Sequence, residues 1–436
     1  MELHKYFIHS ISLSIIFCGI SVSLSQLFLA FALLFMLLEW KKLQFTPLLG
    51  ISLLLFASYF VSFFFHYYQS GFDPAYLARA FRSELKDFFL FSGFLVMQNL
   101  EKKDSATIIK SFRILLLVLV VTGFVAIFSQ VRLARLISDL YSTSASWKFQ
   151  HHITTILGIH LYLPIGLMNT HLTFGGLLLF LFPSAVFAIH DSYKKSHWSK
   201  TTIIQIIIVL ALGMVFLFNN ARSAIAGALI GIAIGIVHNI KFGNLKLPVF
   251  SLKPVVVVLL FLLLAAPVLH NNQTMKKIIA PLLGEEKHTD SGRTFIWNST
   301  FPLIKENVLL GVGPGNYNQE IEKSRKKLSA QNESLLFFYE VAQRGHAHND
   351  YFHLFAIAGI FSVFFYLLLS GIITSMILQL NSEFTVLFYA LPGFFFSGLL
   401  QCYFQDDEVV IVFWFLTGFL NHLYASKDRA LAKAQA

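Results

Sequence analysis

Residues 349–378 read "NDYFHLFAIAGIFSVFFYLLLSGIITSMIL". After Asp350 this stretch contains no aspartate, glutamate, lysine or arginine. About 20 predominantly apolar residues in a helix are enough to cross the hydrocarbon core of a bilayer. The length and apolarity of the stretch therefore predict a transmembrane helix that begins with a polar first turn.

The whole chain has the same character. Of its 436 residues, 56% are hydrophobic, 13% are charged and 48 are phenylalanine. Soluble domains carry about 25% charged residues, so the composition predicts an all-α polytopic membrane protein, and no nucleic-acid partner is expected. Cys18 and Cys402 lie inside predicted spans, where we expect two packing residues rather than a disulfide.

Apolar runs separated by polar breaks predict about twelve membrane spans. They cover residues 8–22, 24–39, 47–66, 86–100, 112–130, 171–190, 203–219, 223–238, 254–270, 349–378, 384–401 and 408–424. The first two are separated only by "SVSLS", so one broken helix is the alternative there. This is the only break in a span that the sequence suggests.

The distribution of lysine and arginine predicts the orientation. Most of these residues in short loops fall on the side that holds both termini, which places the termini in the cytoplasm. The N-terminal apolar stretch lacks a small-residue cleavage site, so a retained first helix is expected. We therefore expect a single integral membrane domain over residues 1–436.

Residues 271–347 form the one soluble-looking segment and are predicted to be a loop between the ninth and tenth spans, on the outer side. Helix-like stretches at 292–307 and 316–344 are joined by the turn "LLGVGPGNY". Its glycines match neither phosphate-loop spacing, so a chain reversal near the membrane is the favoured interpretation. Apolar residues around Trp297 are expected to anchor the segment at the membrane interface.

Two arginines lie at the predicted outer boundary. Arg222, in "FNNARSAIAG", sits just inside the end of the eighth span, and Arg293 lies in the loop. The ordinary interpretation is that the Arg222 side chain extends to the lipid headgroups and that Arg293 is a solvated charge in the loop. The functional interpretation is an anion site, because a guanidinium binds phosphate through two parallel hydrogen bonds.

The histidines of "RGHAHNDYFH" lie at the same boundary. If a helix begins near His348, its face includes Gly359 and Ser362, which would admit a neighbouring helix, whereas His353 points elsewhere. Histidine is the side chain best suited to take a proton near neutral pH. His346, Asn349 and Asp350 are polar neighbours of His348, which favours a base over a residue that only packs at the start of the helix. The spacing of the histidines does not suit a metal site.

An acidic turn, "QDDE", offers a rival site. Asp406, Asp407 and Glu408 lie on the outer side between the last two spans and have the chemistry to bind a divalent ion. An exposed acidic turn is the more ordinary interpretation.

Three segments in this order resemble the bacterial O-antigen ligase and polymerase superfamily. They are "NNARSAIAG" at 219–227, "GRTFIWNSTFPLIKENVLLGVGPGNY" at 292–317 and "HAHNDYFHLFAIAG" at 346–359. "THLTFGG" at 170–176 also resembles a family element. In the family's ligases a histidine and a small polar residue precede nine residues and G-x-x-G. His348 and Asn349 fit this pattern, but position 362 is serine, a departure that affects packing more than chemistry.

The resemblance implies a metal-independent, inverting glycosyltransferase without a cofactor, with the multi-span fold of enzymes that use lipid-linked sugars (GT-C-like). The donor would be a glycan on undecaprenyl diphosphate and the acceptor lipid A-core. The protein would lie in a bacterial inner membrane, with the loop 271–347 and the active site on the periplasmic side. Arg222 and Arg293 would hold the diphosphate, and His348 would be the general base. Substrate contacts are also expected from His346, Asn349 and Asp350.

Two other functions remain open. A polymerase would use the same donor with a lipid-linked repeat unit as acceptor, and the clear histidine motif favours the ligase. A transporter would have discontinuous helices or inverted repeats around a midplane site, whereas the polar residues here gather at the outer boundary.

Overall fold

A computed structural model describes residues 2–39, 45–137, 149–156, 158–243, 291–332, 335–341 and 345–435. The predicted ninth span at 254–270, the beginning of the predicted loop and Arg344 lie outside these residues.

The described chain is almost entirely helical. In its first half the helices are α1 Glu2–Phe17, α2 Val22–Leu38, α3 Pro47–Gln69, α4 Pro74–Arg82, η1 Glu84–Lys86, α5 Asp87–Leu90, α6 Ser92–Gln98, η2 Lys102–Asp104, α7 Ser105–Ile127, α8 Leu133–Ile137, α9 His171–Ser196, α10 Lys200–Asn219 and α11 Arg222–Lys241. In its second half they are α14 Ser291–Glu306, α15 Tyr317–Gln331, α16 Leu336–Val341, α17 Asp350–Gln379, η6 Thr385–Leu387, α18 Ala390–Ser397, η7 Tyr403–Gln405 and α19 Asp407–Gln435.

Seven helices among the described residues are long and apolar enough to cross a membrane. They are Pro47–Gln69, Lys102–Ile127, His171–Ser196, Lys200–Asn219, Arg222–Lys241, Asp350–Gln379 and Asp407–Lys427. Each corresponds to a predicted span, so the predicted class, an all-α polytopic membrane protein, is confirmed. The count of twelve stays a prediction. Two predicted spans, 86–100 and 384–401, are series of short helices rather than single long ones.

The first two predicted spans are two separate helices packed against each other. Two serines join them reciprocally: Ser14 Oγ donates to the carbonyl of Ser25, and Ser25 Oγ to that of Ser14, each at 2.8 Å. The alternative of one broken helix is therefore wrong, because the chain turns back between α1 and α2.

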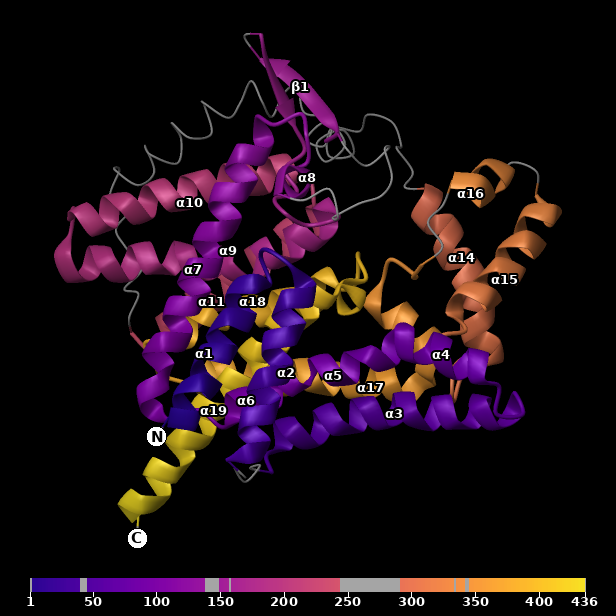
Figure 1. Cartoon of the computed structure of the whole chain (residues 1–436), viewed down its shortest axis with the longest axis horizontal. Helices are drawn as coiled ribbons and strands as arrows, with labels where there is room; N and C mark the ends of the chain where they lie inside the picture. Colours follow the sequence, from indigo (N-terminus) through magenta and orange to yellow (C-terminus); the bar gives the residue numbers. More distant parts are fainter. Residues whose placement is uncertain are drawn as a thin grey trace.

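The elements are arranged with the chain termini and the helices α14–α16 far apart (Figure 1). The N- and C-termini lie near each other at the lower left, and α14, α15 and α16 form a group at the right. α3 runs alongside α17, and the two helices pack against each other. The helices expected in the predicted loop are thus present as α14, α15 and α16.

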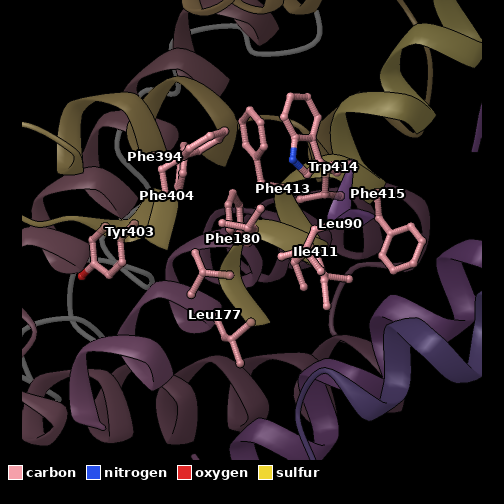
Figure 2. Packing of buried hydrophobic residues seen from close by; sticks show 14 of the residues in the cluster. Leu90, Leu177, Phe180, Phe394, Tyr403, Phe404, Ile411, Phe413, Trp414 and Phe415 are labelled. Atoms are coloured by element: carbon pink, nitrogen blue, oxygen red, sulfur yellow. The ribbon is translucent and has the colours of Figure 1, made fainter. Parts of the chain in front are cut away.

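The core surrounds α19. Residues 409–416 of this helix are fully buried, so neighbours cover it on all sides rather than along one stripe. Aromatic rings fill the space around it (Figure 2): the Phe413 ring lies 4.8 Å from those of Phe394 and Trp414, and Phe91 lies 4.9 Å from Trp414. Between membrane helices such packing stabilises the fold through dispersion, because lipid is as apolar as the side chains.

α17 is broken at Gly359, where φ is 74° and ψ is −170°. The turn 308–313 fills the break: the amide of Val312 donates to Ala356 at 2.7 Å, and that of Ile360 donates to Val308 at 2.9 Å. A Cβ on Gly359 would stand 2.0 Å from the Leu309 carbonyl oxygen, so only glycine fits. Unpaired backbone groups cost several kcal/mol in a membrane, and the turn removes that cost.

This break corrects two expectations. "SVSLS" is not the only break in a predicted span, since α17 is discontinuous. The turn 308–313, and not a helix, approaches Gly359 closely. Ser362 Oγ donates to the carbonyls of Leu354 and Gly359. The chain reversal predicted for "GVGPG" is present, and it is inserted into the helix.

A small antiparallel hairpin interrupts the helical pattern. Strands β1 His152–Ile156 and β2 Ile159–Tyr162 pair with each other between α8 and α9. The sequence did not predict this hairpin, because its two strands are too short and too polar to stand out among the apolar spans.

Candidate functional site

His348 lies just before α17 rather than on it. Asn349 is the N-cap of the helix, with extended backbone and a side-chain oxygen that accepts the amide of Phe352 at 3.0 Å. The predicted helix face began at His348, but the helix begins at Asp350. The prediction is therefore wrong for His348, which lies outside the helix. His348 has φ 49°, a left-handed conformation that is uncommon for any residue other than glycine.

Gln401 orients the imidazole of His348. Nδ1 of His348 lies 3.0 Å from Oε1 of Gln401, and both side chains are buried. With the amide in this orientation, Nδ1–H donates to Gln401. The unprotonated Nε2 is then the atom that accepts a proton, as a general base requires.

His346 packs on the other side of His348. The two rings are 4.5 Å apart at an interplanar angle of 72°, and the backbone amide of His348 donates to Nδ1 of His346 at 3.3 Å. Burial, reinforced by His348, His353 and Arg293, lowers the pKa of His346 to about 3. His346 is therefore a neutral neighbour at pH 7.

Asn349 and Asp350 use their side chains within the fold. Asn349 Nδ2 donates to the carbonyl of Leu399 at 2.8 Å. Asp350 is fully buried, and its carboxylate accepts the amide of Phe404 at 3.0 Å and the hydroxyl of Tyr366 at 3.3 Å. These contacts fix the segment that carries His348 against the chain around Gln401. Contact of either residue with a substrate stays a prediction.

Arg293 lies one turn before Trp297 on α14, so the two share a face of the helix. Trp297 Nε1 donates to the carbonyl of Ala347, directly before His348, at 3.0 Å. Arg293 is also close enough to His346 to contribute to the lowering of its pKa. The structure thus brings Arg293 to the histidine pair, although the two positions are far apart in sequence.

The apolar residues around Trp297 make contacts within the fold, and anchoring at the membrane interface stays a prediction. Phe295 and Ile296 are buried, and the Phe295 ring lies 6.3 Å from that of Phe338 on α16. Trp297 and Phe301 lie against Phe352 at 5.9 and 5.0 Å. These residues attach α14 to α16 and to the first turn of α17.

Arg222 is exposed at the first position of α11. Its neighbour Ser223 hydrogen-bonds the Tyr403 hydroxyl at 3.0 Å, and Figure 2 shows this hydroxyl pointing away from the aromatic core. Burial raises the pKa of Tyr403, while Arg293 acts in the opposite direction. Both arginine-bearing helices therefore approach Tyr403, two positions after Gln401. Direct convergence of Arg222 with His348 stays a prediction.

A pocket of about 460 Å³ opens beside the histidine pair. Its lining residues are Arg132, Gln150, His151, Leu163, Ile165, Asn169, Thr170, His171, Leu172, His346, Gln401 and Asp406. Two of His348's contacts, His346 and Gln401, are in this wall. The "THLTFGG" element contributes Thr170 and His171, so this segment joins the site that contains the histidines.

The acidic turn "QDDE" divides between two places. Asp406 lines the pocket, where burial, together with the like charges of Glu408, Asp350 and Asp407, raises its pKa to about 8. Asp407 instead pairs with Lys86 at 2.6 Å and accepts Gln26 Nε2 at 3.0 Å. Asp406 and Asp407 therefore have different neighbours, which disfavours the rival site in which both would bind one divalent ion.

His353 belongs to a separate buried group behind the site. Its Nε2 lies 3.5 Å from Oε1 of Glu84, and its ring lies 4.8 Å from that of Tyr317. Glu84 Oε2 accepts the amide of Gly315 at 2.7 Å. Burial alone would raise the pKa of Glu84, but these partners hold it below its ordinary value. The group connects η1 to Gly315, just after the turn 308–313, and to the first turn of α17.

Sequence reasoning missed Gln401, Arg132 and His151 as members of the site. Gln401 had a signal, since it ends the predicted apolar span 384–401 with an amide. Arg132 and His151 gave no such signal. Arg132 lies in a short outer loop, and His151 precedes the unexpected hairpin.

The family model described as O-antigen ligase matches residues 206–367. The matched segment includes Arg222, Arg293, His346, His348, Asn349 and Asp350. The match confirms the resemblance to the O-antigen ligase and polymerase superfamily, and it does not separate ligases from polymerases. No curated protein matches the chain.

Proposed function

We propose that this chain, which resembles the O-antigen ligases, transfers a glycan from undecaprenyl diphosphate to a sugar hydroxyl of lipid A-core on the periplasmic face of the inner membrane. The observation that carries the proposal is the buried His348–Gln401 pair beside a pocket lined by three histidines and Arg132. This pair supplies an oriented base, and its surroundings suit an anionic substrate.

In the proposed step, the acceptor hydroxyl oxygen attacks the anomeric carbon of the donor and forms the new glycosidic bond. The bond from that carbon to the diphosphate oxygen breaks, and undecaprenyl diphosphate leaves with the electron pair. The hydroxyl proton passes to Nε2 of His348. Attack opposite the leaving group inverts the anomeric configuration.

The arginines would act on the leaving group. Two guanidinium groups, those of Arg222 and Arg293, suit the diphosphate and stabilise the charge that develops on it. Diphosphate is already a good leaving group, so the step needs neither a general acid nor a metal ion. The position of Arg293 near the histidine pair supports this role.

The discontinuous α17 does not favour a transporter. Transporters use the free backbone groups of broken helices to bind substrates or ions. In α17 those groups are paired with the chain's own turn, for example Val312 with Ala356. The break positions the turn, and these groups already have partners within the chain.

Reconstitution with each acceptor tests the proposal. Purified protein in liposomes receives lipid-linked glycan together with either lipid A-core or a second lipid-linked repeat unit. We expect transfer to lipid A-core, detected as a mass increase of the acceptor. Transfer only to the repeat unit would identify a polymerase. Exchange of solute across the liposome membrane without glycan transfer would contradict both.

A further inference from the structure

A second pocket lies at the start of α1, outside the segment that matches the ligases. Its volume is about 870 Å³. The charged residues of its wall are four carboxylates and two lysines, namely Glu2, Glu39, Glu101, Asp104, Lys5 and Lys103. The carboxylates outnumber the lysines, so the pocket favours cations. On the predicted topology it faces the cytoplasm, on the other side of the membrane from His348.

His4 projects into the carboxylate group. Its Nε2 lies 3.1 Å from Oδ2 of Asp104 and 3.6 Å from Oε1 of Glu101. The three side chains offer ligand atoms that all lie within 4.8 Å of one another. In a tetrahedral zinc site with bonds of about 2.0–2.2 Å, ligand atoms are about 3.3–3.6 Å apart. The two separations from His4 Nε2 are close to that range.

The opposite edge of the same imidazole provides a separate observation. Nδ1 of His4 lies 3.6 Å from Oε2 of Glu39, at the end of α2. Metal-bound histidines typically donate their second ring N–H to a carboxylate, which fixes the tautomer and the direction of the ligating nitrogen. Glu39 lies on that edge of the ring at ion-pair distance, while Nε2 faces Glu101 and Asp104.

Helix capping explains only part of this arrangement. The amide of Glu101 donates to Asp104 Oδ2 at 2.8 Å, and Lys103 pairs with Glu101 Oε2 at 2.7 Å. Both contacts are local to η2. The Glu101 side chain also accepts the Asp104 amide in the same capping box. None of these contacts accounts for the histidine, which comes from another helix and lies 3.6 Å from Glu101 Oε1.

We propose that His4, Glu101 and Asp104 bind one divalent transition-metal ion, with Glu39 orienting His4. One imidazole and two carboxylates suit zinc better than magnesium, which prefers oxygen ligands alone. Water from the pocket completes the coordination. The ion joins the start of α1 to the segment before α7, and through Glu39 to the end of α2.

Zinc titration of the full-length protein tests the site. The protein is purified in detergent with an affinity tag that contains no histidine, stripped with EDTA, dialysed and titrated with zinc against a chromogenic chelator. We expect one equivalent bound, with magnesium failing to compete. H4Q and D104N are expected to weaken binding at least about tenfold, because each removes a ligand.

H9Q is the matched control. His9 is on the same helix and lines the same pocket, but its Nδ1 contacts the Lys5 carbonyl at 2.6 Å instead of the carboxylates. We expect H9Q to bind one equivalent of zinc with wild-type affinity. E101Q provides a further ligand variant if H4Q or D104N does not fold. Equal zinc binding by the wild type and the ligand variants, or none by the wild type, would overturn the proposal.

Discussion

His348 combines a left-handed backbone with a buried hydrogen bond to Gln401. A non-glycine residue in this region costs about 1–3 kcal/mol, and such residues cluster at functional sites. The fold compensates through Asn349, which caps α17, and through Trp297, which holds the carbonyl of Ala347. The result is an imidazole whose position and tautomer are set before a substrate arrives.

Replacing Gln401 tests the orientation of His348. Q401L removes the acceptor of Nδ1–H, so the wrong tautomer becomes populated. We expect kcat to fall about tenfold to a hundredfold with little change in KM for the donor, a smaller loss than the roughly 10²–10⁴ of a missing base. Transfer assays in liposomes measure both constants.

Q379L is the control for this variant, because Gln379 lies exposed at the far end of α17. It should retain wild-type kinetics. An unchanged kcat in Q401L would show that Gln401 does not orient the base.

The buried His346 predicts a dependence of stability on pH. Its pKa is about 3 in the folded protein, against an ordinary value of 6.5. Between these values the unfolded chain binds the proton and the folded chain does not, so stability falls as pH falls below about 6.5. At pH 5 the loss is about 2 kcal/mol.

Thermal unfolding in detergent at pH 7 and pH 5 measures this effect. H346Q lacks the titrating group, so its Tm should fall less than that of the wild type over this interval. Parallel falls in the two proteins would show that His346 does not titrate as described.

At the scale of elements, the turn 308–313 and the broken α17 form one unit. The turn pairs with both sides of the break, and Ser62 of α3 donates to carbonyls of the turn and of the helix, at Leu310 and Ile357. The break therefore depends on a close approach of backbone to backbone, which glycine alone permits.

G359A should displace this turn. A Cβ at Gly359 meets the Leu309 carbonyl carbon and oxygen, and the backbone there has φ 74°. We expect a loss of about 3 kcal/mol or more, by analogy with other strained sites. The expected results are a lower Tm and reduced glycan transfer.

G371A is the matched control on the same helix. A Cβ at Gly371 meets no atom within 4 Å, and the backbone there is helical. This variant should match or exceed the wild-type Tm. Equal behaviour of G359A and G371A would contradict the proposed role of the break.

The sequence predicted long helices well and their interruptions poorly. Apolar length alone indicates a helix such as α3 or α10, because the bilayer sets the requirement. The break at Gly359 depends on a partner turn about fifty positions earlier in the chain, which no local pattern contains. For the same reason His348 was identified from its neighbours along the chain, whereas Gln401 was not.

At the scale of the whole molecule, the predicted topology places the histidine site and the pocket at His4 on opposite sides of the membrane. Both termini are expected in the cytoplasm and α14–α16 in the periplasm. The figure of the fold agrees with a separation of these parts, since the termini lie far from α14–α16 (Figure 1).

Labelling of single cysteines tests this orientation. Ala330 on α15 and Lys102 before α7 are exposed, while the native Cys18 and Cys402 are buried and free. In cells with a permeabilised outer membrane, A330C should react with an impermeant maleimide. K102C should react only after the inner membrane is opened. The reverse pattern would contradict the topology.

The central claim is that His348 takes the proton of the acceptor hydroxyl during glycan transfer. The most direct measurement compares wild type and H348Q in liposomes under single-turnover conditions, with the same lipid-linked donor and lipid A-core acceptor. We predict that H348Q folds and binds the donor as the wild type does, but transfers at least about a hundredfold more slowly. Transfer by H348Q at the wild-type rate would contradict the account.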